Sequence, residues 1–202
     1  LTKDATIREI HHRVKNNLQT VAALLRLQSR RSDSDEVRQA LEEAQRRVAA
    51  IATVHETLAH EPGTYVDFDE VAQRLTLMVR DMTRDMRRGT ITVQGSFGVL
   101  RSEHATALAM ALTELVSNAV EHGIALRETE GAVVVKAQRS NELVVTIEDD
   151  GPGIPESGII EGLGLSIVRT IVTQDLRGSL TITPREGGGT VARVAVPMLG
   201  TD

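Results

Sequence analysis

The stretch from residue 145 to residue 168, VTIEDDGPGIPESGIIEGLGLSIV, constrains the fold more than any other part of the chain. A strand-like apolar run ends in acidic residues, and Asp149 stands where the strand should end. Two glycine pairs follow, Gly151 with Gly153 and Gly162 with Gly164. Glycines let the backbone adopt φ > 0 or lie against a ligand, and a glycine pair that opens a helix leaves N–H groups free for phosphate oxygens. The pattern favours a nucleotide site, although glycine-rich turns that merely join strands and helices look similar.

The first third of the chain has a different, helical pattern. Residues 4–31 have apolar residues at three- and four-residue steps without glycine or proline, which predicts one long helix. Ser32 to Asp35 breaks the pattern, and a second helix with a heptad rhythm then runs until Glu61-Pro62-Gly63. A single helical hairpin cannot bury both apolar seams. Two hairpins can, so we expect a homodimer built around a four-helix bundle.

The heptad rhythm stops near Tyr65, so we expect two domains, residues 1–63 and 64–202. The second domain should contain a helix from 71 capped by Asp67 or Asp69, and a helix over 103–121 capped by Ser102. The remaining expected elements are strands at 90–96, 132–138, 142–148, 179–183 and 190–196 and a helix at 163–175. This order predicts an α+β fold, an α/β sandwich with helices on one face of a mixed, mostly antiparallel sheet. Regular βαβ alternation and a GxxxxGK[ST] run are absent, which excludes Rossmann and P-loop folds.

Composition excludes several functions. The formal charge of −5 gives no general attraction to nucleic acid or to anionic membranes. The chain has no cysteine, which excludes disulfides and thiolate chemistry and is compatible with a cytoplasmic location. No apolar run is long enough to span a membrane, so we expect no membrane contact by this segment. Leu1 in place of methionine suggests a fragment of a longer protein.

The helix over 103–121 contains polar residues in an otherwise apolar run, LTELVSNAVEHG. Glu114 and Asn118 are four residues apart and share one helix face. An amide oxygen such as that of Asn118 is a suitable ligand for Mg²⁺, and a nearby carboxylate could act as a base or orient water. A hydrated polar face is the plainer interpretation of these residues. Thr190, which follows three glycines, could reach a water beside a bound base or could simply begin a strand.

These motifs together resemble a known family. ELVSNAVEHG, EDDGPGIP and GLGLSIV are similar to the N box and the two glycine boxes of the Bergerat ATP-binding fold shared by gyrase, Hsp90, MutL and histidine kinases. REIHHRVKNNLQ resembles the phosphoacceptor box of sensor histidine kinases of the HisKA_2 and HWE-related class. The resemblance covers residues 4–197. It implies a dimerisation and histidine-phosphotransfer hairpin followed by a catalytic domain that binds ATP and Mg²⁺.

The resemblance also implies roles for individual residues. His12 would accept the phosphoryl group, Asn118 would coordinate Mg²⁺, and Asp149 would recognise the adenine amino group. Glu114 falls where related ATPases place a water-activating carboxylate. The remaining implied nucleotide-binding residues are His122, Gly151 and Gly153 beside the base, Gly162, Leu163, Gly164 and Leu165 beside the phosphates, and Thr190. A response-regulator receiver domain is the implied partner, and a sensor domain would lie upstream, outside this segment.

Helix geometry favours His12 over His11 as the acceptor. At about 100° per residue, His11 lies about 50° from the centre of the apolar stripe and His12 about 150° from it. An acceptor must meet ATP held by another domain, so the outward-facing His12 is preferred and His11 becomes a bundle residue. Arg13 follows His12 where the commonest kinases have an acidic residue. A base would then come from elsewhere, such as Glu9 or Glu114.

The segment between the two glycine boxes is short and lacks the phenylalanine of many histidine kinases, which predicts an open pocket and weak nucleotide binding. We therefore expect an autophosphorylating histidine kinase core and keep two alternatives. One is a degenerate dimerisation scaffold. The other is a serine/threonine kinase or an ATPase on the same fold, which would have no need of the HHRVKNN helix.

Overall fold

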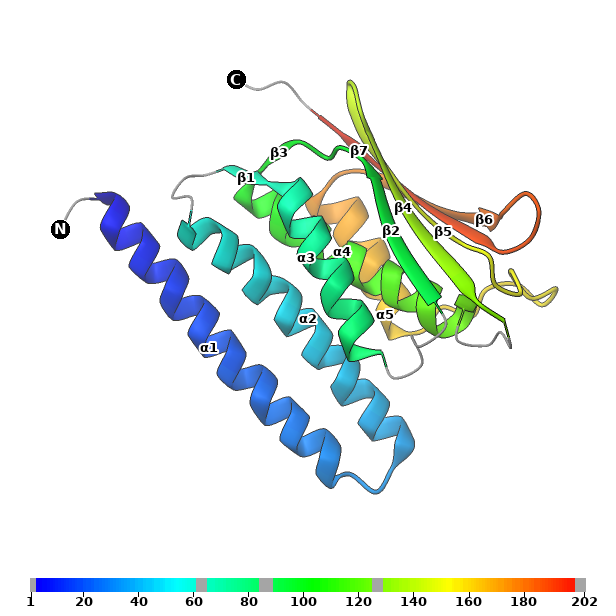
Figure 1. Cartoon of the computed structure of the whole chain (residues 1–202), viewed down its shortest axis with the longest axis horizontal. Helices are drawn as coiled ribbons and strands as arrows, with labels where there is room; N and C mark the ends of the chain where they lie inside the picture. The colour runs from blue at the N-terminus through cyan, green and yellow to red at the C-terminus, as the bar shows by residue number, and fades with distance from the viewer. Residues whose placement is uncertain (1–2, 61–64, 84–88, 125–128, 199–202) are drawn as a thin grey trace.

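The computed structural model describes residues 3–60, 65–83, 89–124 and 129–198. Two long helices come first, α1 (Lys3–Arg31) and α2 (Asp35–His60). They form an antiparallel hairpin in which α2 lies between α1 and the rest of the molecule (Figure 1). The predicted hairpin is therefore confirmed. The predicted boundary between residues 63 and 64 lies outside the described residues, so the division into 1–63 and 64–202 stays a prediction.

The rest of the chain is an α+β unit, as predicted. Its elements are β1 (Tyr65–Asp67), α3 (Phe68–Met82), β2 (Gly89–Gly95), β3 (Val99–Arg101), α4 (Ser102–Asn118), β4 (Gly131–Arg139), β5 (Glu142–Asp149), α5 (Leu163–Thr170), β6 (Ser179–Pro184) and β7 (Thr190–Pro197). Single π-helical segments, Ala119–Ile124 and Ile171–Asp175, extend α4 and α5. The main sheet has the order β2-β4-β5-β7-β6, in which only β2 and β4 are parallel.

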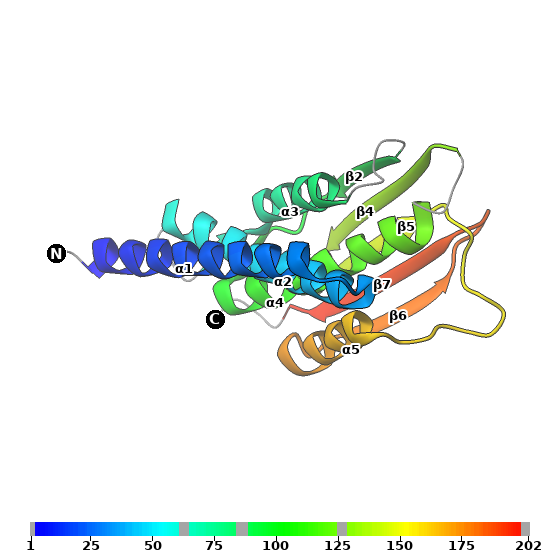
Figure 2. The ribbon, with the colours of Figure 1, turned by 90° about the horizontal axis from the view of Figure 1, so that it is seen from below.

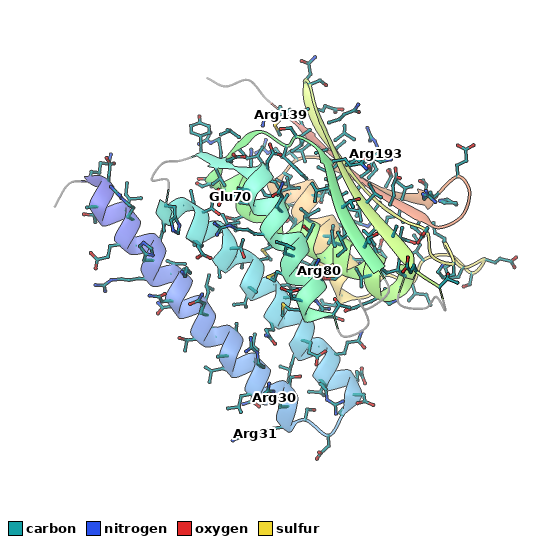
Figure 3. The ribbon with its side chains drawn as sticks, viewed as in Figure 1. Arg30, Arg31, Glu70, Arg80, Arg139 and Arg193 are labelled. Carbon is teal, nitrogen blue, oxygen red and sulfur yellow. The ribbon has the colours of Figure 1, made fainter. Side chains whose placement is uncertain are left out.

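The helices of this unit lie over one face of the main sheet (Figure 2), and no described helix lies on its other face (Figure 1). Alternate residues of β4 and β5 are buried toward α4, for example Val133 and Ile147. Phe68, the first residue of α3, and Phe97 are fully buried, with ring centroids 5.1 Å apart. Arg139, near the end of β4, ties this corner together by donating to the carbonyl oxygen of Phe97 at 2.8 Å (Figure 3).

Of the two helix N-caps predicted from the sequence, one is confirmed and one is wrong. Asp67 is the N-cap of α3 and accepts from the backbone N–H of Asp69 at 3.1 Å, so one of the two predicted candidates is confirmed. Ser102 was expected to cap the helix that follows, and this prediction is wrong. Strand β3, which the sequence pattern did not reveal, runs directly into α4. Arg101 therefore takes the extended cap position without a side-chain bond, and Ser102 is the first helical residue.

Candidate nucleotide site

A cavity of about 570 Å³ lies at the C-terminal end of α4. The C-terminal end of β5, the start of β7 and the start of α5 form its other walls. All the residues predicted to bind nucleotide contribute to its lining except Gly151, which lies behind the wall. The residues at the cavity are Glu114, Asn118, His122, Asp149, Gly153, Gly162, Leu163, Gly164, Leu165 and Thr190. Segments far apart in the sequence are thus brought to one place.

Asp149 is the buried carboxylate of the cavity, with 7% of its surface exposed. It is the last residue of β5 and pairs with Thr190 at the start of β7. The backbone N–H of Gly151 donates to its Oδ1 at 2.9 Å. Burial raises the pKa of Asp149 above its usual range, and hydrogen bonds from the backbone amides of Gly151 and Thr190 partly oppose this shift. The side chain is a fixed acceptor in a mostly apolar wall.

The first glycine pair is required by geometry. Gly153 has a φ of 83°, a conformation that favours glycine. Gly151 lies against the backbone of Gly123, where an added Cβ would stand 2.5 Å from its Cα. A Cβ on Gly123 would in turn meet Cγ of Asp149 at 2.7 Å. Gly123 was not among the predicted site residues, although its position directly after His122 at the end of the helical pattern was a usable signal.

The second glycine pair opens α5. Gly162 is the cap residue of α5 and has no side-chain partner for the first N–H groups of that helix, which therefore remain available to an anion. Leu163 is 68% exposed beside this opening, whereas Leu165 is buried. A Cβ on Gly164 would meet Oε2 of Glu114 at 2.6 Å, so a larger residue here would displace the Glu114 carboxylate.

Glu114 is held by the hairpin rather than free in the cavity. Nε of Arg47, from α2, donates to its Oε1 at 2.6 Å, and only 6% of the Glu114 side chain is exposed. Arg46, the preceding residue of α2, pairs with Glu121 at 2.9 Å. Burial raises the pKa of Glu121, and the charge of Arg46 opposes the shift. A carboxylate paired in this way is a poor candidate for a base while α2 stays in place.

The donor set at Asn118 fits a magnesium ion that is held mostly by its ligand. Asn118 is half-buried at the cavity, and no cluster of three or more histidine, aspartate or glutamate residues suited to a metal occurs within the part of the chain that the structure describes. Mg²⁺ usually keeps several waters and binds one or two protein oxygens together with substrate phosphates. The amide oxygen of Asn118 can supply one such ligand, and the start of α5, whose first N–H groups have no side-chain cap, lines the same cavity.

The two histidines of α1 occupy different surroundings. His12 is exposed, and its ring lies edge-on to that of His60 with centroids 6.4 Å apart. His11 is half-buried against α2, with its Nδ1 3.0 Å from Nδ1 of His55. Burial lowers the pKa of both His11 and His55, with smaller contributions from His12 to the first and from His11 to the second. These positions agree with the outward orientation expected for His12.

The contribution of α2 to the cavity was not foreseen. Gln39, Glu43 and Arg46 line the cavity although they belong to the hairpin. Their signal in the sequence was a pair of arginines within an otherwise regular heptad, which on its own predicts only a charged helix face. On α1, Arg30 and Arg31 lie at the C-terminal end of the helix, the end far from His12. They stand beside the α1–α2 loop and away from the sheet (Figure 3).

Two protein families match the chain. The family described as "Histidine kinase" matches residues 9–83, and the one described as "Histidine kinase-, DNA gyrase B-, and HSP90-like ATPase" matches residues 103–200. The sensor histidine kinases PdtaS of Mycolicibacterium smegmatis and Mycobacterium tuberculosis are both 48% identical over 98% of this chain. The chain spans 40% of the length of each of these relatives.

Solved structures show the same architecture. The histidine kinase domain of a blue-light-activated histidine kinase from Erythrobacter litoralis superimposes with a TM-score of 0.70 at 28% identity. That comparison covers 96% of this chain and 94% of the other. The shared arrangement thus includes the hairpin as well as the sheet. Within the described residues, no helix is both long and apolar enough to cross a membrane.

Proposed function

The chain belongs to the histidine kinases, and on this basis we propose that it transfers the γ-phosphoryl group of ATP to His12 and then to an aspartate of a response regulator. One observation carries the proposal. A cavity with a buried acceptor, an amide ligand and an open helix start lies in the same chain as a solvent-exposed histidine on a helical hairpin. A domain that only binds nucleotide needs no such histidine.

The cavity suits ATP in one orientation. Asp149 would accept a hydrogen bond from the adenine amino group, and the apolar side chains of Ile147 and Ala192 would pack against the base. Gly153 and Thr190 border the same region. The triphosphate would then lie toward Asn118 and the free N–H groups of α5, between Gly162 and Leu165. Bound Mg²⁺ would neutralise the developing charge of the phosphoryl group in transfer.

Transfer requires the two parts of the chain to move. Arg46, at the cavity, and His60, beside His12, lie about four turns apart on α2, or about 21 Å along its axis. If two hairpins pair about a two-fold axis parallel to their length, the partner's His12 lies at the same position along that axis. It is then equally far from the cavity in this direction. The α+β unit from β1 to β7, which we call the ATP-binding unit, must therefore shift along the hairpin to deliver the phosphoryl group, whether transfer occurs within one chain or between two.

The hairpin also supports the proposed homodimer. Ile10, Val21 and Leu24 are 52%, 43% and 57% exposed on α1 and form a stripe about 60° wide. His12 lies about 150° from this stripe, so a partner hairpin could cover the apolar residues without covering the acceptor. A phosphohistidine is a reactive donor, suited to an aspartate of a receiver domain. ATP is a cytoplasmic substrate, so we place this core in the cytoplasm, downstream of a sensor domain.

Incubation with γ-labelled ATP and Mg²⁺ tests the proposal. Wild type should acquire label that is lost in acid and kept in alkali, as expected for phosphohistidine. Asn118→Ala should lower the labelling rate by at least about a hundredfold, because phosphoryl transfer relies on charge stabilisation at this site. Asn141→Ala, in the exposed turn after β4, is the matched control and should label normally. Acid-stable label would instead indicate a serine/threonine kinase.

Calorimetric titration with Mg-ATP addresses the remaining alternatives. A chain that binds nucleotide but never acquires label, and releases phosphate, would be an ATPase. The Arg47–Glu114 pair disfavours that activity, because water activation needs an available carboxylate. No binding even at millimolar Mg-ATP would indicate a scaffold and contradict the proposal.

A further inference from the structure

Phosphorylation of His12 leaves a proton that must be removed. A neutral imidazole attacks with the lone pair of one ring nitrogen, and its other ring nitrogen still carries hydrogen when the new bond has formed. Arg13, the following residue, cannot accept this proton. Glu9, one turn earlier, is occupied by Arg13, which donates to its Oε1 from Nε at 3.0 Å and from Nη2 at 2.7 Å.

The other acidic candidates are also engaged. Glu56 of α2 lies between two cations, 3.3 Å from Nζ of Lys15 and 3.7 Å from Nη1 of Arg74. Glu114 is paired with Arg47 of α2 in the present arrangement of the two parts. Among the described residues, His60 has its ring beside that of His12, with the two centroids 6.4 Å apart.

The hydrogen bonding of His60 fixes which of its nitrogens is free. Its Nδ1 lies 2.8 Å from the backbone carbonyl oxygen of Glu56. A carbonyl oxygen can only accept, so Nδ1 of His60 carries the hydrogen and Nε2 of the neutral ring has an unshared lone pair. This is the tautomer that a proton acceptor requires.

The position of His60 also suits the charge it would acquire. It is the last residue of α2, where backbone carbonyl groups without helical partners give the helix end a partial negative charge. The ring is exposed, so the proton can then pass to water.

We propose that His60 is the base for phosphorylation of His12, an inference that rests on the function proposed above. One ring nitrogen of His12 forms a bond to the γ-phosphorus, and the bond from that phosphorus to the β–γ bridging oxygen breaks, with its electron pair leaving on ADP. The hydrogen on the other ring nitrogen of His12 passes to Nε2 of His60. His60 keeps its hydrogen bond to the carbonyl oxygen of Glu56, and a rotation of the exposed His12 ring would bring these nitrogens from their present edge-on contact into hydrogen-bond distance.

The test compares His60→Gln and His60→Ala with wild type in the full chain. His60→Gln retains a polar side chain but supplies no base, and should label about a hundredfold more slowly at saturating Mg-ATP with unchanged nucleotide affinity. His60→Ala should be equally slow. Added imidazole should restore its labelling rate by about tenfold without accelerating wild type, because a small base can enter the vacated space.

His104→Ala, on α4, is the matched control and should label normally with or without imidazole. A wild-type rate in His60→Gln, or a slow His60→Ala that imidazole does not restore, would overturn the role of His60. In that case label on wild type would still support a histidine kinase. Absence of label in wild type itself would overturn the proposed function, and the assignment of His60 with it.

Discussion

The first helix of the hairpin leaves most of its apolar residues at least partly exposed, whereas the central helix of the ATP-binding unit is largely buried. α1 has Ser29 as its only buried residue among those described, while Ile10, Val21, Leu24 and Leu27 remain exposed. α4 buries eleven of its seventeen residues, from Ala105 to Ser117, between the hairpin and the sheet. The core of the ATP-binding unit is complete within one chain and includes Val54 and Leu58 of α2. The hairpin has one seam closed by α2 and a second seam that is open.

This difference indicates a division of labour. A rigid site requires fixed walls, and the buried strands and helices around Asp149 supply them. A hairpin with an open apolar seam is suited to a second copy of itself, and its exposed face leaves His12 accessible. The two regions meet through buried apolar residues of α2, such as Val54 and Leu58, and through Arg46 and Arg47, which pair with Glu121 and Glu114 at the cavity.

Truncating a core side chain tests the contrast most strongly. Phe68→Ala should lower the free energy of unfolding by about 3–5 kcal/mol, because it leaves a cavity beside Phe97. Leu27→Ala, at a site 46% exposed on α1, should change it by about 0.5 kcal/mol or less. Urea unfolding followed by circular dichroism measures both. Equal losses would show that the hairpin is packed as tightly as the ATP-binding unit.

The contact between the regions can be broken at Arg47. Arg47→Ala leaves Glu114 buried without its partner and should cost about 3 kcal/mol of stability. Replacing both residues by leucine should recover most of the loss, because no charge then remains buried. Arg13→Ala removes an exposed pair with Glu9 and should cost about 0.5 kcal/mol or less. A small effect of Arg47→Ala would mean that the two regions are not held together by this pair.

The exposed apolar stripe of α1 predicts that a charged side chain placed in it weakens the dimer. Leu24→Glu should weaken the dimer by about a hundredfold, measured by sedimentation equilibrium, because a carboxylate would be buried within the stripe. Leu77→Glu is a matched control, since Leu77 of α3 is 52% exposed but lies outside the hairpin. Dissociation by both variants, or by neither, would contradict the proposed dimer face.

Acid should lower the stability of the hairpin before that of the ATP-binding unit. We expect this effect to be smaller than those of the substitutions above. The pKa values of His11 and His55 are lowered from 6.5 in the folded chain, so the unfolded chain binds more protons as the pH falls below 6.5. The stability of the hairpin should therefore decrease there, and His55→Gln should reduce the decrease. Thermal melting on either side of that pH gives the comparison. A melting temperature that rises in acid would contradict the sign.

The parts of this molecule that could be predicted from sequence are those with a local signal. Period and glycine spacing predicted the hairpin, the sheet strands and the cavity around Asp149, because these depend on neighbouring residues. Strand β3 was missed because its three residues are too few to show alternation. The arginines of α2 were missed as site residues because their partners, Glu114 and Glu121, are about seventy residues away and only packing brings them together.

The most direct test of the division between the regions is labelling and nucleotide affinity measured side by side in wild type, His12→Gln and His11→Gln. His12→Gln should bind Mg-ATP as tightly as wild type and acquire no acid-labile label, whereas His11→Gln should still be labelled. Label that persists in His12→Gln, or nucleotide affinity that is lost with it, would contradict an account in which the ATP-binding unit supplies the phosphoryl group and the hairpin receives it.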